Sequence, residues 1–388
     1  MTNKNYLLID AYRRLSQKPA NAVLATIIET FGSTYQKAGA KMLIERNGEL
    51  TGLLGGGCFE KDLMEQAQSV FETGKSKAVF YDMRSSEDVI WGLGLGCNGA
   101  VRVLLQLLKA EEDFYPLNMI AGAAEADTTG VLITTFESGH PDFPAGSSLF
   151  LSSLTIDDDR PLATYPFTVS ACQTLLQRKP HIEAHVVDGH VVKTFYDLIQ
   201  PPLQLLVLGA GADAVPVVRY AKSLGWRVTV VDYRSGHIKP ERFPEADRLL
   251  NLIPEDLAVN MKLDQFNAMV LMTHNIEADE RYLKGIANSR IPFIGLLGPM
   301  PRKDRLLQTL GVKATRIRDR VFGPIGLDIG AEAPEEIALS IIAGILAAMN
   351  QRDGRQLNTK GKENARNNLS IMSPHPSSFN TAKGRGCD

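Results

Sequence analysis

Hydrophobic and polar residues recur with different periods along the N-terminal part of the chain, and each period predicts a different element. Apolar residues have helical spacing over 7–15 and again over 59–71. Four β-rich runs accompany these segments, at residues 22–28, 41–45, 49–54 and 100–105. The turn signal Asn47-Gly48 joins the second and third runs into a hairpin. These elements predict an N-terminal α/β domain over residues 1–110.

Strand patterns prevail in the middle of the chain, over residues 111–202. Runs at 130–135 and 185–192 have the composition of strands, and Asp188-Gly189 marks a hairpin within the second run. Pro201-Pro202 closes the region, because paired prolines disfavour both helices and central strands. We therefore expect a β-rich middle region.

The remaining chain alternates short apolar runs with amphipathic segments, which is typical of a parallel sheet with helices on both faces. The expected strands cover 203–208, 227–231, 268–272 and 293–297, and the expected helices cover 213–224, 279–288 and a last segment that begins at Pro334. The fold class is therefore α/β, with a Rossmann-type C-terminal domain over 203–350. Residues 351–388 are polar and poor in apolar side chains, which predicts a disordered tail.

Composition and charge narrow the range of partners. The 388 residues carry a formal net charge of −2, so no basic field attracts nucleic acid or an anionic membrane. The longest apolar run, 340–349, is too short to span a bilayer, and the N-terminal residues lack a signal-peptide pattern. The sequence contains no C-x-x-C pair, which argues against a disulfide framework and a structural zinc site; its cysteines are Cys58, Cys97, Cys172 and Cys387. We expect a cytoplasmic protein with free thiols that binds a small molecule or another protein.

A glycine turn opens the predicted Rossmann-type domain. Gly209 allows a tight turn after an apolar strand, Gly211 lets the backbone approach a phosphate, and Ala214 takes the third, close-packed position. Asp232 ends the next strand, where a carboxylate can accept a hydrogen bond from a ribose hydroxyl. This pattern predicts nucleotide binding. The alternative is a Rossmann fold that has lost its nucleotide, and Asp213 favours it by placing a carboxylate where a phosphate would lie.

Two glycine-rich loops carry cysteines in the first domain. Gly55-Gly56-Gly57-Cys58-Phe59-Glu60 lies between a strand and a helix, where free N–H groups can bind an anion and lower the pKa of the Cys58 thiol. Cys97 follows a second glycine cluster, residues 92–96. The two thiols could converge on a ligand that carries a phosphate and a soft metal or sulfur centre. The alternative is that both cysteines are buried and inert.

Two further residues could act at the carboxyl edge of the parallel sheet. His274 follows the predicted strand 268–272, so it lies where α/β sheets bind ligands and could serve as an acid or base in hydride transfer. Arg302, shortly after Gly298, could bind an anion. The alternatives are a loop histidine and an ordinary surface arginine.

Taken together, these motifs resemble the XdhC/CoxI family of accessory factors for molybdenum hydroxylases such as xanthine dehydrogenase. The resemblance extends to about Asn350 and rests on ordered matches at residues 29–35, 39–42, 55–60, 94–99, 209–211, 232–234, 272–275, 295–299, 324–330 and 334–338. It implies a protein that binds molybdenum cofactor, protects it while its terminal sulfur ligand is installed, and delivers it to an apo molybdenum hydroxylase of the xanthine dehydrogenase type. A sulfur donor of the cysteine desulfurase type is a further implied partner. A homodimer is compatible with the sequence but not indicated by it.

The resemblance also implies a set of binding residues. Cys58 and Cys97 would contact the molybdenum centre, and the cofactor-binding residues would be Gly55, Gly56, Gly57, Cys58, Glu60, Gly96, Cys97, Asn98, Gly209, Gly211, Ala212, Asp232, Arg234, Thr273, His274 and Gly298. One position departs from the family: relatives often have histidine where this chain has Ala212. No catalytic residue is expected, because the implied role is binding and delivery.

Two other functions remain open at this point. An NAD(P)-dependent oxidoreductase would use the turn Gly209–Ala214 and Asp232, with Arg234 able to accommodate a 2′-phosphate. An interaction scaffold with both sites vestigial would associate with a molybdoenzyme and bind no small molecule. The cofactor chaperone is the preferred hypothesis, with molybdenum cofactor as cargo.

Overall fold

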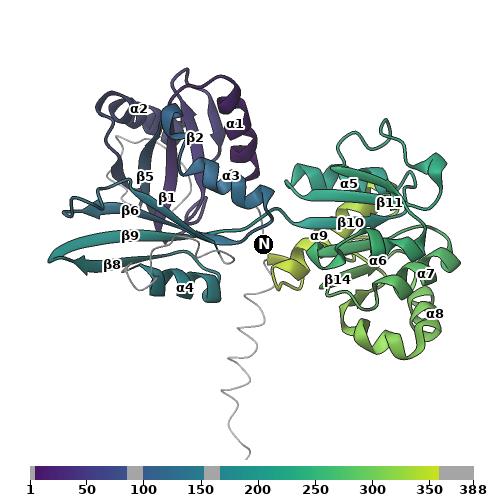
Figure 1. Ribbon diagram of the computed structural model, residues 1–388. Helices are drawn as coiled ribbons and strands as arrows, with labels where there is room; N and C mark the ends of the chain where they lie inside the picture. Colours follow the sequence, from purple (N-terminus) through teal and green to yellow (C-terminus); the bar gives the residue numbers. More distant parts are fainter. Residues whose placement is uncertain (1–4, 85–98, 153–166, 358–388) are drawn as a thin grey trace, which may run out of the picture.

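The computed structural model of the chain describes residues 5–84, 99–152 and 167–357. Figure 1 shows two lobes, one built from the purple and blue N-terminal half and one from the green and yellow C-terminal half. The first lobe contains two antiparallel sheets, and the second contains one parallel sheet. No helix within these ranges is long and apolar enough to cross a membrane.

The first sheet has five strands in the order β3-β2-β1-β5-β4. Their bounds are β1 (Ala22–Gly32), β2 (Lys41–Glu45), β3 (Leu50–Gly52), β4 (Lys77–Asp82) and β5 (Gly99–Leu108). Alternate residues of β1 point to opposite faces, so Val23 and Ile27 pack against α2 (Gly57–Thr73), while Leu24 packs against α1 (Tyr6–Gln17). Both faces of β1 are therefore buried, which explains its continuous apolar run.

The second sheet has four strands in the order β7-β6-β9-β8. Their bounds are β6 (Gly130–Ser138), β7 (Ser148–Ser152), β8 (His181–Val187) and β9 (His190–Ile199). Helix α4 (Thr168–Gln177) covers one face, and α3 (Leu117–Glu125) packs against the other. Asp188 and Gly189 have positive φ angles of 48° and 79° in the β8–β9 turn, so the predicted hairpin is confirmed.

A buried ion pair joins the two antiparallel sheets. The Lys41 ammonium on β2 donates to the Asp197 carboxylate on β9, and their side chains are only 1% and 9% exposed. Gly39 is required beside this pair, because a Cβ there would lie 2.7 Å from Asp197 Oδ1. Ile28, Leu104 and Phe195 form the apolar part of the same contact between the sheets.

The C-terminal lobe is a Rossmann-type domain with the strand order β12-β11-β10-β13-β14-β15. The strands, all paired in parallel, are β10 (Gln204–Leu208), β11 (Arg227–Asp232), β12 (Arg248–Asn251), β13 (Ala268–Leu271), β14 (Phe293–Leu296) and β15 (Val321–Phe322). Successive strands are added on one side of β10 up to β12 and then on its other side from β13, so the direction of winding reverses between β10 and β13. Such a switch point is where open α/β sheets bind ligands.

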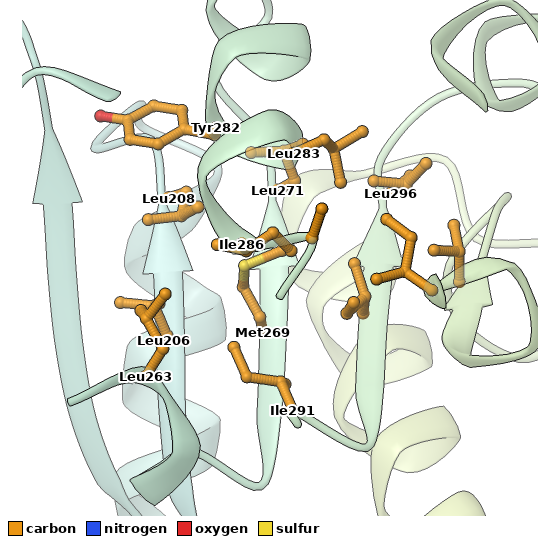
Figure 2. Packing of buried hydrophobic residues seen from close by; sticks show 14 of the residues in the cluster. Leu206, Leu208, Leu263, Met269, Leu271, Tyr282, Leu283, Ile286, Ile291 and Leu296 are labelled. Carbon is orange, nitrogen blue, oxygen red and sulfur yellow. The ribbon is translucent and has the colours of Figure 1, made fainter. Parts of the chain in front are cut away.

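Helices cover both faces of this sheet, as the sequence predicts. Helices α5 (Ala214–Ser223) and α9 (Pro334–Met349) share one face, and α6 (Leu257–Asn260), α7 (Ile276–Ile286) and α8 (Met300–Leu310) lie on the other. Figure 2 shows the second face, where Leu206, Met269 and Leu271 of the strands meet Leu283 and Ile286 of α7. The α/β fold class is confirmed.

Candidate functional site

The first glycine loop leads directly into α2. Gly56 is the N-cap residue, and its carbonyl accepts the N–H groups of Phe59 and Glu60 at 2.9 and 3.4 Å. Gly55 is fixed by packing, since a Cβ there would lie 2.7 Å from Phe59 Cδ1. The first N–H groups of a helix lack intrahelical acceptors and carry partial positive charge, so this loop offers an anion a favourable environment.

A cavity of about 240 Å³ lies beside this loop. Its walls come from four separate segments of the first lobe and consist of Tyr35, Gln36, Leu54, Gly55, Gly56, Phe59, Met83 and Val101. Leu54, Phe59 and Val101 are buried, whereas the residue Tyr35 is 64% exposed. Cavities for drug-sized ligands are roughly 300–1,000 Å³, so this one has the size for a small ring system.

Two acidic side chains at the start of α2 have contrasting environments. Asp62 accepts a 2.6 Å hydrogen bond from the Tyr81 hydroxyl. Burial, followed by this contact with Asp62, raises the pKa of Tyr81, so the phenol remains a donor. The Glu60 Oε1 atom is also shielded from solvent, but it has no hydrogen-bond partner among the described residues. A shielded carboxylate oxygen without a donor is energetically unfavourable, but Glu60 is not among the residues that line the cavity.

Several predicted binding residues fall where the structure gives no side-chain description. Gly96, Cys97 and Asn98 lie outside the described residues, and for Cys58 only the backbone, in the first turn of α2, is described. Gly99, just after that cluster, pairs with Gly32 of β1, and a Cβ on Gly99 would lie 2.4 Å from the Ser33 carbonyl oxygen. Over residues 5–84, 99–152 and 167–357, no group of three or more His, Cys, Asp or Glu side chains has metal-binding geometry.

The Rossmann turn is packed tightly against the neighbouring strand. Gly209 has φ +115°, and a Cβ there would lie 2.5 Å from the Met272 carbonyl oxygen, so only glycine fits. The N–H of Ala210 donates to Asp232 Oδ2 at 2.7 Å. The turn after β10 is therefore tied to the ends of both β11 and β13.

The Asp232 carboxylate is completely buried and engaged on both oxygens. Arg234 donates its backbone N–H and Nε to Oδ1 at 2.8 and 3.0 Å, and its terminal nitrogen to Oδ2 at 2.8 Å. Burial by itself raises the pKa of Asp232, but the hydrogen bonds from Arg234 and Ala210 outweigh it and hold the pKa below its usual range. Asp232, predicted to accept a hydrogen bond from a ribose hydroxyl, and Arg234, predicted to accommodate a 2′-phosphate, are thus bound to one another.

A contact between Asp213 and His274 covers Gly211. The Asp213 carboxylate folds back so that a Cβ on Gly211 would lie 2.4 Å from Asp213 Oδ1. Asp213 Oδ2 and His274 Nε2 are 2.7 Å apart, and His274 adopts a positive φ of 59°. Ala212, the departure from the family, lies in the same turn. A carboxylate therefore occupies the surface of Gly211 that a phosphate would approach, as the sequence suggested for Asp213.

A third pair involves a residue that the sequence analysis missed. Asp279 is buried in α7; its carboxylate accepts a hydrogen bond from the Thr273 hydroxyl and one from Arg302 at 2.5 Å. Gly298, with φ +110°, leaves room for the Arg302 side chain, whose Cδ would lie 2.8 Å from a Cβ there. Arg302, predicted as an anion ligand, is thus paired within the protein. The sequence marks Asp279 only by its position in α7, a helix that begins close to the end of a strand of the sheet.

Matches to known proteins cover both lobes. The family described as "XdhC and CoxI family" matches residues 15–82, and the "XdhC Rossmann domain" matches residues 205–345. A protein of Bacillus subtilis (strain 168) described as a probable xanthine dehydrogenase component is 32% identical over 341 residues, which are 88% of this chain and 96% of that protein. The chain belongs to the XdhC/CoxI family.

Other relatives of this XdhC/CoxI family member extend the comparison. A crystal structure described as a xanthine dehydrogenase from Bacillus halodurans is 28% identical, with a TM-score of 0.72, and covers 89% of this chain and 96% of that one. The uncharacterised protein YqeB of Escherichia coli (strain K12) is 31% identical over 155 residues, 39% of this chain and 28% of that protein. The matched segment 15–82 holds the glycine loop and most of the cavity wall, and 205–345 holds the carboxyl edge of the parallel sheet.

Proposed function

We propose that this XdhC/CoxI family member is an accessory factor that holds molybdenum cofactor in the cavity beside Gly55 and Gly56 and delivers it to an apo-enzyme of the xanthine dehydrogenase type. The cavity itself carries the proposal: it combines an apolar wall, an exposed aromatic ring and a glycine backbone at a helix N-terminus. Two relatives described as xanthine dehydrogenase proteins support the identity of the client.

The residues present fit the chemistry of this cargo. The first N–H groups of α2 suit a phosphate, and Leu54, Phe59 and Val101 suit a heterocyclic ring. The Cys58 thiol, in the first turn of α2, and the Cys97 thiol are soft ligands suited to a molybdenum–sulfur centre. When bound, the cofactor supplies the redox chemistry of the client enzyme, and this chain supplies binding, shielding and release. A sulfur donor of the cysteine desulfurase type is part of the proposal.

Retention of the cofactor after gel filtration tests this function. We expect Cys58→Ala to reduce the molybdenum and pterin retained by the full chain about tenfold or more, because a metal–thiolate contact is lost. Cys172→Ala is the matched control, since Cys172 is an exposed thiol on α4, the helix that covers one face of the second sheet. Equal retention by both variants would show that Cys58 is structural, and no retention by the wild type would overturn the proposal.

An NAD(P)-dependent oxidoreductase is the second candidate, favoured by the strand order and the Gly209 turn. Two contacts weigh against it. Arg234 donates a hydrogen bond to the Asp232 carboxylate, and the Asp213 carboxylate covers Gly211. We therefore expect neither NADH nor NADPH to bind at about millimolar concentration, the weak end of the affinity scale. Fluorescence titration of each nucleotide is the measurement, and micromolar binding of either would favour the oxidoreductase.

A further inference from the structure

Strand β8 leaves one of its two edges open. It ends the order β7-β6-β9-β8, and among the described residues it pairs only with β9 (Figure 1). The two-residue turn after Val187 pairs this residue with His190, so every second residue of β8, counted back from Val187, exchanges hydrogen bonds with β9. The N–H and C=O groups of Ile182, Ala184 and Val186 therefore point away from β9.

This open edge lacks the features that usually protect an edge strand. Natural edges are short, or they carry a charged side chain, a proline or a bulge. Strand β8 has seven residues, whereas the other edge strands of the described sheets, β3, β4, β7, β12 and β15, have two to six. Its outward residues Ile182, Ala184 and Val186 are apolar, and Val186 is 74% exposed. Such an edge favours pairing with another strand.

The residues of this edge complement one another when two copies of β8 pair in antiparallel orientation. A pairing centred on Ala184 places Ile182 of one copy opposite Val186 of the second copy. It also places Glu183 of one copy opposite His185 of the second copy, on the other face of the sheet. The apolar and the polar side chains therefore each meet their own kind.

Glu183 and His185 each keep one polar atom that can join two copies. Burial raises the pKa of Tyr196 to about 12, so its hydroxyl stays protonated and donates to His185 Nε2 at 2.8 Å. Burial also lowers the pKa of His185, so the neutral ring carries its proton on Nδ1. Glu183 accepts the Ser170 hydroxyl on Oε2. The Nδ1–H of His185 and the Oε1 of Glu183 have no hydrogen-bond partner within the described part of the chain, and they are a matching donor and acceptor.

We propose that β8 is a docking edge for a second copy of this chain, with the two β8 strands paired antiparallel about a two-fold axis at Ala184. A two-fold contact uses the same surface on both copies, so it must be self-complementary. The outward backbone groups, the Ile182–Val186 contacts and the Glu183–His185 hydrogen bonds all meet this condition. The pairing joins the second sheets of the two copies into one continuous sheet, and it is independent of the cargo proposed for the cavity.

Sedimentation of the full chain over a concentration series tests the docking edge. We expect a dimer with a dissociation constant on the order of 10 µM, because the contact is small. Ala184→Pro removes an N–H that points away from β9, so the pairing with β9 remains and the dimer should weaken about tenfold or more. Ala184→Thr keeps the N–H and is the matched control, which should dimerise as the wild type does.

An exchange of side chains tests the register. His185→Glu places two carboxylates opposite one another, and it should weaken the dimer about tenfold. Adding Glu183→His restores an acid opposite a histidine in the second copy and should recover most of the loss. Contacts within one copy cannot explain such a recovery, because the exchange removes the native partners of Ser170 and Tyr196. Thermal unfolding checks that each variant is folded.

Three results would contradict the proposal. A wild type that stays monomeric at about 100 µM has no such edge contact. A dimer unaffected by Ala184→Pro forms through another surface, and a loss in His185→Glu that the exchange does not recover excludes this register. Amide hydrogen exchange identifies the occupant of the edge: Ile182 and Val186 should exchange slowly in the dimer and rapidly in the Ala184→Pro monomer. Slow exchange in a monomeric wild type would show that the same chain covers the edge.

Discussion

Asp232 shows how single residues set the chemistry at the carboxyl edge of the parallel sheet. Hydrogen bonds from Arg234 and Ala210 lower its pKa in spite of burial. A carboxyl whose pKa is lower when folded stabilises the fold above its unfolded pKa, about 3.9, and this contribution is lost as pH falls below that value. Asp232→Asn should lower the free energy of unfolding by about 1–3 kcal/mol at pH 7. Unfolding at pH 7 and pH 3 checks this, and an equal cost at both values would contradict it.

The ion pair between Lys41 of β2 and Asp197 of β9 is a buried polar contact between the two antiparallel sheets. Lys41→Met should destabilise the protein by about 3–5 kcal/mol, because it leaves the Asp197 carboxylate buried without its counter-ion. The double variant Lys41→Met with Asp197→Leu removes both charges and should recover much of that loss. Urea unfolding of the wild type, the two single variants and the double variant is the measurement. A double variant as unstable as the sum of its single changes would show that the pair does not act as a unit.

Elements with strong periodicity could be predicted from the sequence, and those without it could not. The predicted α2, β10 and α9 have clear apolar patterns. Helix α3 was missed because it is short, at nine residues, and rich in small alanine and glycine side chains, which leave a weak apolar pattern. Helix α8 was missed because its buried residues lie only in its last part, and the exposed edge strand β4 has few buried positions.

The same limit applies to the candidate site. Glycine spacing was sufficient to predict the Gly209 turn and the loop before α2, because both depend on local backbone geometry. The sequence could not show that Asp213 covers Gly211 with His274 as its partner, or that Tyr35 faces the cavity. These contacts join residues far apart in the chain, and only the folded arrangement determines them.

At the scale of the whole molecule, the two candidate sites lie in different lobes. The cavity belongs to the first lobe. Strand β9 leads through Pro201-Pro202 into the amino end of β10, so the loops at the carboxyl edge lie at the opposite end of the parallel sheet (Figure 1). At that edge, arginines already pair with Asp232 and Asp279, and His274 lies within hydrogen-bond distance of Asp213. The cavity beside the glycine loop is therefore the site that an external ligand can complete.

Metal and pterin analysis of the protein purified from cells that make molybdenum cofactor tests this account most directly. The account predicts that molybdenum and pterin copurify in equal amounts, that Cys58→Ala loses both, and that Cys172→Ala retains both. Protein that carries no more molybdenum or pterin than the same protein from cells unable to make the cofactor would contradict it.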